Sequence, residues 1–268
     1  MIEFFAFPFF QRALAAGFIV AVVCGALSFF VVLRRLAFVG SGVSHGAFGG
    51  VALAALVGAP PGLGALVAAL AVALATAKAS DDGELTEDTA VGVFTVAAMA
   101  IGVVAISFLE TNVDLFGLMF GNILTVDPKD LVALGAASLL VLALLTLYFR
   151  PLLLASIDED GAFAAGVNVT RMRLLVLVLL ALTVVVALKV VGILLVSALL
   201  VLPGAVARSL ASRWPGFLLG SIGASLAMVL GGLLLSVALD IPSGAAIILT
   251  GTLCFLGSVA AGRVRRWA

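Results

Sequence analysis

The side chain with the clearest chemical use is His45, the only histidine among the 268 residues. It stands ten residues after Arg35, which corresponds to about 15 Å along a helix and to the middle of a hydrocarbon core about 30 Å thick. Ionisable groups at that depth are costly and usually face a cavity or pathway, and imidazole is a common ligand of transition metals. We therefore expect His45 to line an ion path. The alternative is a histidine that bonds a neighbouring carbonyl and joins two helices.

Small and hydroxyl-bearing residues surround this histidine. Ser44 precedes it directly, and Ser41 stands four residues earlier, on the same face of a helix. Residues 40–50 include five glycines, which permit either close helix packing or a break where backbone carbonyls help to bind an ion. We place Ser41 and Ser44 in a metal pathway and give Gly50 a structural role.

Four acidic residues are further candidates for contact with a cation. Glu87 and Asp88 begin a hydrophobic segment, where the positive end of the helix dipole favours carboxylates and where Thr86 or Asp88 can cap the helix. The alternative role of this pair is a cytoplasmic exit for a cation. Asp114 and Asp240 fall on the outer side as candidate ligands, at a distance from the histidine that the sequence does not give.

A polar stretch, residues 156–167, separates two hydrophobic segments. Acidic residues lead into small residues there and end at Gly166, a pattern that predicts a short helix with Gly166 at its C-cap. Such a helix would lie across the membrane face and offer a surface to a partner. The alternative is an ordinary connecting turn.

Three further features have structural meaning. Residues 113–124, which contain Gly121, are too short to span a membrane and too apolar for an open loop, so we expect a re-entrant or gate helix, or a helix lying on the surface. Pro203 stands inside an apolar segment and removes one helical hydrogen bond. Pro242 marks a tight turn before the final segment.

Sites that hydrolyse ATP or break bonds are not evident in the sequence. None of Lys78, Lys129 and Lys189 follows the glycine of a GxxxxGK pattern, and a single histidine leaves no Ser/His/Asp set. Cys24 and Cys254 lie in apolar stretches and indicate neither a disulfide framework nor a CxxC site. The chain is therefore predicted not to be an enzyme, which leaves a transporter, a channel or a membrane scaffold.

The composition requires lipid around the elements that carry these residues. Apolar residues make up 64% of the chain and charged residues 10%, against about 25% charged in a soluble domain. The mean hydropathy is +1.36. A soluble enzyme, a nucleic-acid binder and a disordered protein are excluded, and the zero net charge provides no global field that attracts a charged partner.

Hydrophobic segments of membrane-spanning length follow one another along the chain. A membrane helix needs roughly 20 residues, and the sequence contains nine candidates, or eight if the short pair at 174–207 is counted differently. The segments are 13–33, 37–57, 63–79, 90–109, 131–149, 174–188, 191–207, 216–238 and 245–262. The sequence thus predicts an all-α polytopic membrane protein with one membrane domain over residues 1–268.

Basic residues predict the orientation, because they stay on the cytoplasmic side. With the amino end outside and the carboxyl end in the cytoplasm, only Arg12, Lys129 and Lys189 lie outside. The eleven on the inside are Arg34, Arg35, Lys78, Arg150, Arg171, Arg173, Arg208, Arg213, Arg263, Arg265 and Arg266.

Five stretches in this order resemble the permease subunit of the bacterial ABC importers for zinc, manganese or iron, over about residues 8–262. The matching stretches are Leu33–Leu53 with Ser44-His45, Glu87–Gly92, Asp114–Val126, Lys189–Arg208 and Asp240–Ile247. Gly204 stands where the family has alanine, and Ala245 where it has proline.

The resemblance implies a helical bundle like that of a type II importer, in the bacterial inner membrane. Its expected partners are an ABC ATP-binding subunit, an extracytoplasmic metal-binding protein and a second permease copy, with a homodimer favoured. No nucleic acid is expected as a partner. No cofactor is expected to be bound permanently, and the transient ligand would be zinc, manganese or iron. The alternative function is an autonomous ion channel or an ion-coupled secondary carrier.

Individual positions also match the family. Residues 156–167 resemble its coupling helix, which docks on the ATPase, with Asp158, Asp160, Ala162 and Gly166 at matched positions. The family commonly has aspartate where this chain has Ser41. A hydroxyl is a poor ligand for Zn²⁺ or Mn²⁺, so another carboxylate substitutes, the site is weaker, or the substrate differs.

Overall fold

The computed structural model describes residues 8–81, 85–108, 121, 126–211 and 213–267. These residues form helices and connecting segments without a strand, and nine of the helices are long and apolar enough to cross a membrane. They are α1 (Pro8–Leu33), α2 (Ala37–Leu56), α3 (Pro61–Asp81), α4 (Glu87–Ser107), α6 (Pro128–Leu147), α9 (Val169–Val191), α10 (Ile193–Leu210), α11 (Trp214–Leu239) and α12 (Ser243–Trp267). The predicted all-α class and the count of nine segments are confirmed.

The short pair of segments at 174–207 forms two helices because of one residue. Gly192 has a φ of +83°, a conformation that glycine adopts at little cost. It ends α9 at Val191, and α10 begins at Ile193. A single residue is therefore enough to separate two spans.

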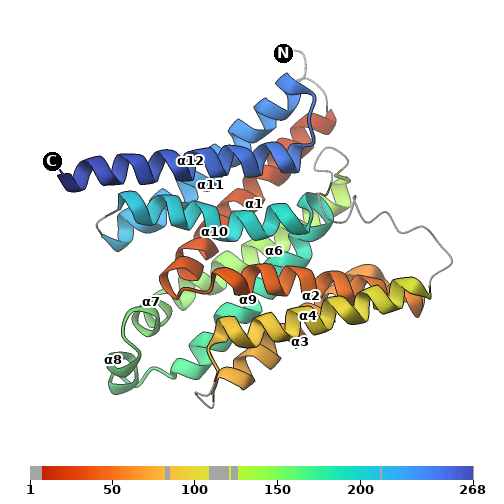
Figure 1. Cartoon of the computed structure of the whole chain (residues 1–268), viewed down its shortest axis with the longest axis horizontal. Coiled ribbons are helices and arrows are strands. Elements are labelled where there is room, and N and C mark those ends of the chain that lie inside the picture. Colours follow the sequence, from red (N-terminus) through yellow and green to blue (C-terminus); the bar gives the residue numbers. More distant parts are fainter. Residues whose placement is uncertain (1–7, 82–84, 109–120, 122–125, 212, 268) are drawn as a thin grey trace.

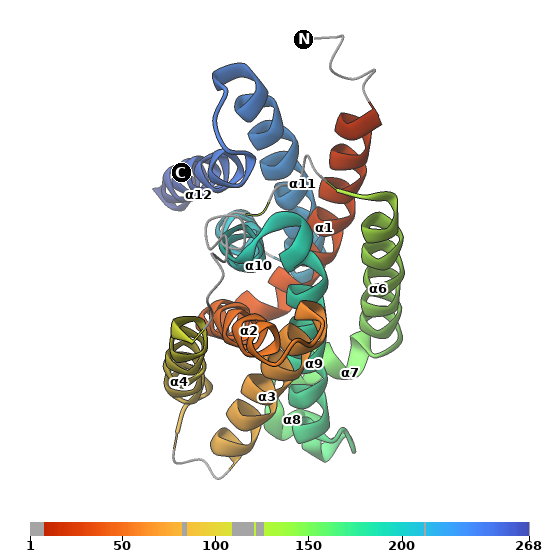
Figure 2. The ribbon, with the colours of Figure 1, turned by 90° about the vertical axis from the view of Figure 1, so that its right-hand side faces the viewer.

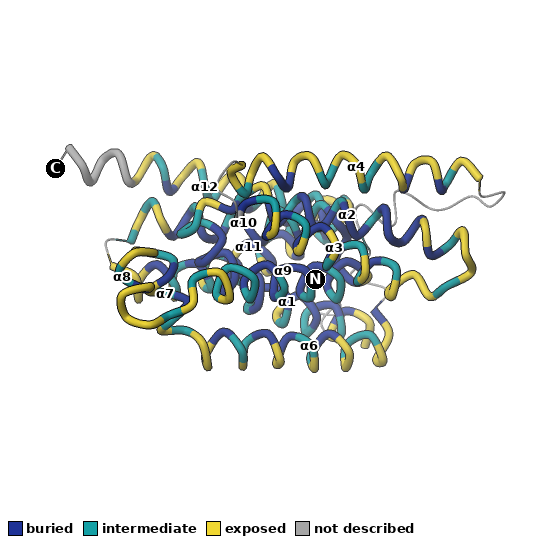
Figure 3. The backbone as a smooth tube through the Cα atoms, turned by 90° about the horizontal axis from the view of Figure 1, so that it is seen from below, coloured by how far each residue is buried: buried dark blue, intermediate teal, exposed yellow. Residues whose placement is uncertain are grey.

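The helices form a bundle (Figures 1 and 2), and its described residues have a buried centre and an apolar outside. α1, α2 and α9 are mostly buried, whereas no more than a third of the residues of α4, α6, α11 and α12 are buried (Figure 3). The exposed faces carry large apolar side chains such as Phe18, Val132 and Leu219. Apolar faces of this extent suit contact with lipid, as the composition predicts.

Two short helices, α7 (Phe149–Ile157) and α8 (Glu159–Ala164), lie at one end of the bundle together with the α10–α11 turn and the carboxyl end (left in Figure 1). We call this the basic end, because basic residues stand at the helix ends and turns that meet there. Those with described side chains are Arg34, Arg35, Lys78, Arg150, Arg171, Arg173, Arg208 and Arg213.

The glycines of α2 allow close packing and do not break the helix. α2 runs without interruption from Ala37 to Leu56 and packs mainly on α3 and α4. A Cβ atom on Gly50 would collide with the backbone of Gly64 on α3, and one on Gly102 of α4 would lie 2.6 Å from the Cα atom of Gly49. Small residues of this kind let two backbones approach directly. Of the two alternatives for the glycines, the structure supports packing.

A side chain from α1 compensates for the proline inside α10. Pro203 has no backbone N–H to donate, and the next residue, Gly204, donates its N–H to Ser28 Oγ at 2.8 Å. The Ser28 hydroxyl also lies 3.4 Å from the carbonyl oxygen of Val201, to which it donates. Ser28 is fully buried, so α1 and α10 are joined by polar contacts inside an apolar core.

Candidate functional site

The His45 ring is oriented by its own helix. Its Nδ1 atom lies 2.8 Å from the carbonyl oxygen of Ser41 and 3.4 Å from the Ser41 hydroxyl. Because a carbonyl only accepts, the neutral ring carries its proton on Nδ1 and presents the lone pair of Nε2. Nε2 has no hydrogen-bond partner among the described residues. The bond stays within α2, so it does not join two helices.

Ser41 and His45 lie on a stripe of α2 that neighbouring helices leave partly uncovered. Both are half-buried, as is Phe48, and Phe38 is 68% exposed. Ser44 differs, since it is fully buried and its hydroxyl donates to the Gly40 carbonyl at 2.8 Å. The structure thus brings Ser41 and His45 together on an open face and turns Ser44 away from it.

The outer acidic candidates do not join this pair in the described part of the chain. Asp240 is an exposed residue at the end of α11 with a φ of +53°. α2 packs mainly on α3, α4, α9 and α10, whereas α11 packs on α1, α10 and α12. Asp114 lies outside the described residues. No group of three His, Cys, Asp or Glu side chains within the described ranges could hold a metal ion.

Two predicted structural residues lie at close contacts. Gly121 has a φ of +62°, and a Cβ atom there would collide with the backbone of Val191 and Gly192, where α9 meets α10. Pro242 lies in the turn between α11 and α12, and Ser236 Oγ donates to the adjacent Ile241 carbonyl at 2.6 Å. Apart from Gly121, the segment 113–124 lies outside the described residues, so the gate-helix expectation stays a prediction.

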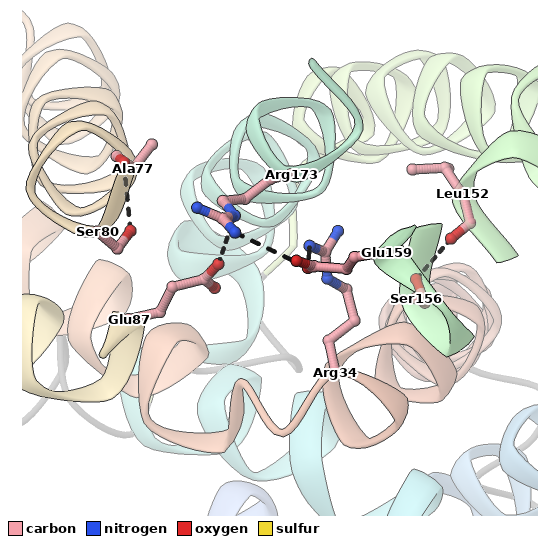
Figure 4. A network of polar contacts seen from close by, with 8 residues as sticks. All are labelled: Arg34, Ala77, Ser80, Glu87, Leu152, Ser156, Glu159 and Arg173. Atoms are coloured by element: carbon pink, nitrogen blue, oxygen red, sulfur yellow. Dashed lines mark hydrogen bonds and ion pairs between the residues drawn. The ribbon is translucent and has the colours of Figure 1, made fainter. Parts of the chain in front are cut away.

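An ion-pair cluster occupies the basic end (Figure 4). Arg173 at the start of α9 places Nε 2.8 Å from Glu87 Oε1 at the start of α4. The Glu159 carboxylate on α8 lies 3.8 Å from Arg173 and 3.7 Å from Arg34, which follows α1. Four elements that are remote in sequence therefore meet through charged groups.

Three of the four members of this cluster are shielded from solvent. The side chains of Arg34, Glu87 and Arg173 are 5%, 15% and 17% exposed, against 56% for Glu159. Burial lowers the pKa of Arg34, and the charges of Glu87 and Glu159 oppose that effect. The positive charges of Arg34 and Arg173 make Glu87 a poor cation ligand, which favours its role at the start of the helix. Asp88 is exposed and forms no ion pair with a described residue.

Helix α8 has the form that residues 156–167 predict. The Asp158 carboxylate accepts the Gly161 N–H at 3.0 Å as an N-cap, and a Cβ on Gly161 would collide with that carboxylate. Ala162 is fully buried, while Asp158 and Asp160 are exposed. Ala165 is the C-cap. Gly166 follows it with a φ of +79° and donates its N–H to the Phe163 carbonyl at 3.0 Å, so the glycine ends the helix as predicted but one position beyond the C-cap.

The start of α4 also follows a sequence signal. Thr86 is the N-cap, and its hydroxyl accepts the Thr89 N–H at 3.3 Å. The partners of Glu87 could not be predicted, because no fixed spacing connects it with Arg34, Glu159 and Arg173. The sequence indicates only that each of these charged residues stands near the end of a helical segment.

Comparison with known proteins is consistent with this architecture. Residues 6–262 match the ABC 3 transport family. The chain is 36% identical over 254 residues to the manganese transport system membrane protein MntC of Halalkalibacterium halodurans, covering 94% of this chain and 87% of that protein. It is 31% identical over 249 residues to the high-affinity zinc uptake system membrane protein ZnuB of Haemophilus influenzae, covering 92% and 95%.

A solved structure has the same fold. The structure of PsaBC from Streptococcus pneumoniae in complex with Fab matches with a TM-score of 0.84 and 32% identity, covering 96% of this chain and 95% of that chain. The chain therefore belongs to the ABC 3 transport family, the permease subunits of bacterial metal-ion ABC importers, and is a multi-pass inner-membrane protein whose partner subunit hydrolyses ATP.

Proposed function

We propose that two identical copies of this chain form the pathway of an ATP-driven importer for a divalent transition-metal ion. The observation that carries the proposal is the uncovered stripe of α2, on which His45 presents an unbonded Nε2. The names of the relatives point to manganese and zinc as substrates, and a further relative is named as a probable iron transport system membrane protein. We propose zinc, manganese and iron as the ions to test.

The ligand set fits an ion in transit. One imidazole and one hydroxyl per copy hold a metal weakly, whereas a closed cage of four ligands would retain it. Water would complete the coordination at His45, and we propose that the outer carboxylates of Asp114 and Asp240 meet the ion at a separate point of its path. The metal is thus a transient substrate in this proposal, and no cofactor stays bound.

The basic end is assigned to the cytoplasm, and the amino end to the outside, by the positive-inside rule. α8 then lies at the cytoplasmic face, with Asp158, Glu159 and Asp160 exposed at its start. We assign α8 as the contact for the ATP-binding subunit. An extracytoplasmic metal-binding protein would deliver the ion at the opposite end.

The ion-pair cluster connects this contact to the pathway. Glu159 on α8 pairs with Arg173, and Arg173 pairs with Glu87 at the start of α4. α4 in turn packs directly on α2 through Gly49 and Gly102. A displacement of α8 by the ATPase would therefore reach the helix that carries His45 through two ion pairs and one backbone contact.

The test is metal uptake by the reconstituted complex of this chain with its ATP-binding and extracytoplasmic partners. We expect ATP-dependent uptake of manganese, zinc or iron, and a loss of at least about tenfold in His45→Ala at equal protein in the membrane. Ser44→Ala is the matched control, because its hydroxyl is turned away from the stripe. Wild-type uptake by His45→Ala would refute the role of His45. Uptake without ATP would instead support a channel or a secondary carrier.

A further inference from the structure

A cavity opens at the basic end, away from the α2 stripe. It has a volume of about 510 Å³ and lies among the ends of α1, α7 and α10 and the start of α11. Six of its lining residues matter here: Leu33, Ile157, Arg208, Arg213, Trp214 and Phe217.

The two arginines of this cavity have no acidic partner in the described part of the chain. The ion pairs between described residues involve Arg34, Arg173 and Lys189, but neither Arg208 nor Arg213. The guanidinium of Arg208 lies 5.7 Å from the centroid of the Phe217 ring, a cation–π contact that leaves its N–H groups available to an anion. Two positive charges without a counter-charge favour an anionic ligand.

The start of α11 adds to the positive potential of the cavity. Arg213 is the N-cap residue and forms no side-chain cap bond, and the first turn of α11 contains no acidic residue. A helix start of this kind carries a partial positive charge and unpaired N–H groups. The 26-residue helix therefore directs its positive end toward the same space as the two guanidinium groups.

An aromatic cluster holds the walls of the cavity in place. The Phe217 ring lies 4.7 Å from Phe29, and the Trp214 ring lies 5.6 Å from Phe149, measured between ring centroids. Phe29 and Phe149 also stack on each other at 6.4 Å. The residues that position Arg208 and Trp214 are thus packed before any ligand arrives, which lowers the cost of ordering the site.

The location of the cavity identifies the kind of anion. α10 ends at Leu210 and α11 begins at Trp214, so the guanidinium groups lie where two spans leave the hydrocarbon. Arg208, Arg213 and Trp214 are all exposed there, so the cavity opens to the outside of the bundle at the edge of the hydrocarbon.

Exposed apolar side chains at the cavity favour an amphiphilic ligand over a small soluble anion. Ile157 is 63% exposed and Trp214 48% exposed. Acyl and glycerol carbons would cover these surfaces, while a phosphate would pair with the guanidinium groups. Tryptophan is enriched at this depth of membrane proteins, and basic pockets between spans on the cytoplasmic side bind anionic headgroups.

We propose that this cavity binds an anionic phospholipid of the inner leaflet, with its phosphate between Arg208 and Arg213 and its glycerol region against Trp214 and Ile157. The site is distinct from the metal pathway and does not depend on which ion is transported. It would attach the α10–α11 turn to the membrane surface, next to the helix pair α7–α8.

Native mass spectrometry of the permease–ATPase complex, purified in mild detergent and supplied with phosphatidylglycerol or phosphatidylcholine, tests the proposal. We expect retention of phosphatidylglycerol and a loss of about fivefold in affinity for each guanidinium removed, in Arg208→Gln, Arg213→Gln and the double variant. Arg171→Gln is the matched control, because Arg171 is exposed at the same end of the bundle but does not line the cavity. Arg213→Gln alone keeps the test valid if Arg208→Gln fails to fold.

Three results would overturn the proposal. Equal retention of phosphatidylglycerol by the wild type and the double variant would show that Arg208 and Arg213 do not bind the lipid. Displacement of the lipid by millimolar inorganic phosphate would show a site for a soluble anion. Loss of the ATPase subunit from the double variant, with lipid retention unchanged, would assign the cavity to the contact with the ATPase.

Discussion

At the scale of residues, the candidate pathway depends on how one imidazole is held. The Ser41 carbonyl accepts a hydrogen bond from His45 Nδ1, which leaves Nε2 without a hydrogen-bond partner among the described residues. The neighbouring hydroxyl of Ser41 is the weak part of this ligand set. Its replacement by a carboxylate would place two good metal ligands on one face, since residues four apart are neighbours on a helix.

Ser41→Asp is therefore expected to bind the metal more tightly and to release it more slowly. A carboxylate beside the neutral imidazole is worth roughly tenfold in affinity, and the same gain would lower the maximal uptake rate. Metal titration of the purified complex measures the first effect, and uptake at saturating metal measures the second. Ser41→Asn is the control, because asparagine has the shape of aspartate without its charge. Unchanged affinity in Ser41→Asp would mean that residue 41 does not reach the ion.

The second prediction at this scale concerns Gly204. A Cβ atom there would lie 2.5 Å from the Ser28 carbonyl oxygen and 2.7 Å from its hydroxyl. We expect Gly204→Ala to cost about 1–3 kcal/mol of stability, because added volume in a packed core forces neighbours apart. Thermal unfolding in detergent measures the loss. Gly223→Ala is the control, since nothing lies within 4 Å of the added atom, and an equal loss in both variants would contradict the packing argument.

At the scale of elements, the spans could be predicted well and their contacts could not. Lipid thickness restricts the length of a spanning helix, so uncharged runs in the sequence mark α1 to α4, α6 and α9 to α12. The end of α8 could also be predicted, because a glycine such as Gly166 commonly follows the last turn of a helix. The pairing of Glu87 with Arg173, and of Ser28 with Gly204, joins helices far apart in sequence, and no local pattern encodes either contact.

The ion-pair cluster leads to a prediction that separates coupling from stability. Glu159 is more than half exposed, but its partner Arg34 is buried, so Glu159→Gln should cost about 1–3 kcal/mol of stability. If Glu159 transmits displacement of α8, the number of metal ions imported per ATP hydrolysed should fall several-fold. Uptake and ATP hydrolysis, measured together in proteoliposomes, give that ratio.

Arg171→Gln is the matched control for this variant. Arg171 is exposed at the start of α9, outside α8, and forms no ion pair with a described residue. It should keep the wild-type ratio, and Glu159→Asp should restore part of it. A wild-type ratio in Glu159→Gln would show that coupling runs through another contact.

At the scale of the whole molecule, the uncovered stripe of α2 supports the proposal that the functional unit contains two copies. A single chain buries most of its α1 and α9 but leaves Phe38, Ser41 and His45 partly open. Two copies that face each other with these stripes would enclose a pathway along their axis. From the sequence, a homodimer could be predicted only through resemblance to the permease family. Which face of α2 stays uncovered depends on how the helices pack, and no local pattern encodes that packing.

Cysteine cross-linking tests this arrangement. We expect Phe38→Cys in a Cys254→Ser background to form a disulfide-linked dimer in membranes on mild oxidation, since the remaining Cys24 is fully buried. Leu219→Cys in the same background is the control, because Leu219 is exposed on α11, away from the stripe. The fraction of dimer on a non-reducing gel measures the result. Efficient cross-linking of the Leu219→Cys variant, with none of the Phe38→Cys variant, would place the interface elsewhere.

The half-open polar stripe also bears on how the transporter is made in the cell. If two copies assemble as proposed, a newly inserted copy would expose an imidazole and a hydroxyl to acyl chains until its partner arrives, and polar groups in hydrocarbon are costly. An unassembled permease would thus expose polar groups that the proposed dimer buries. Membrane quality-control proteases that recognise such groups would degrade single copies, so the amount of assembled transporter would depend on how fast two copies meet.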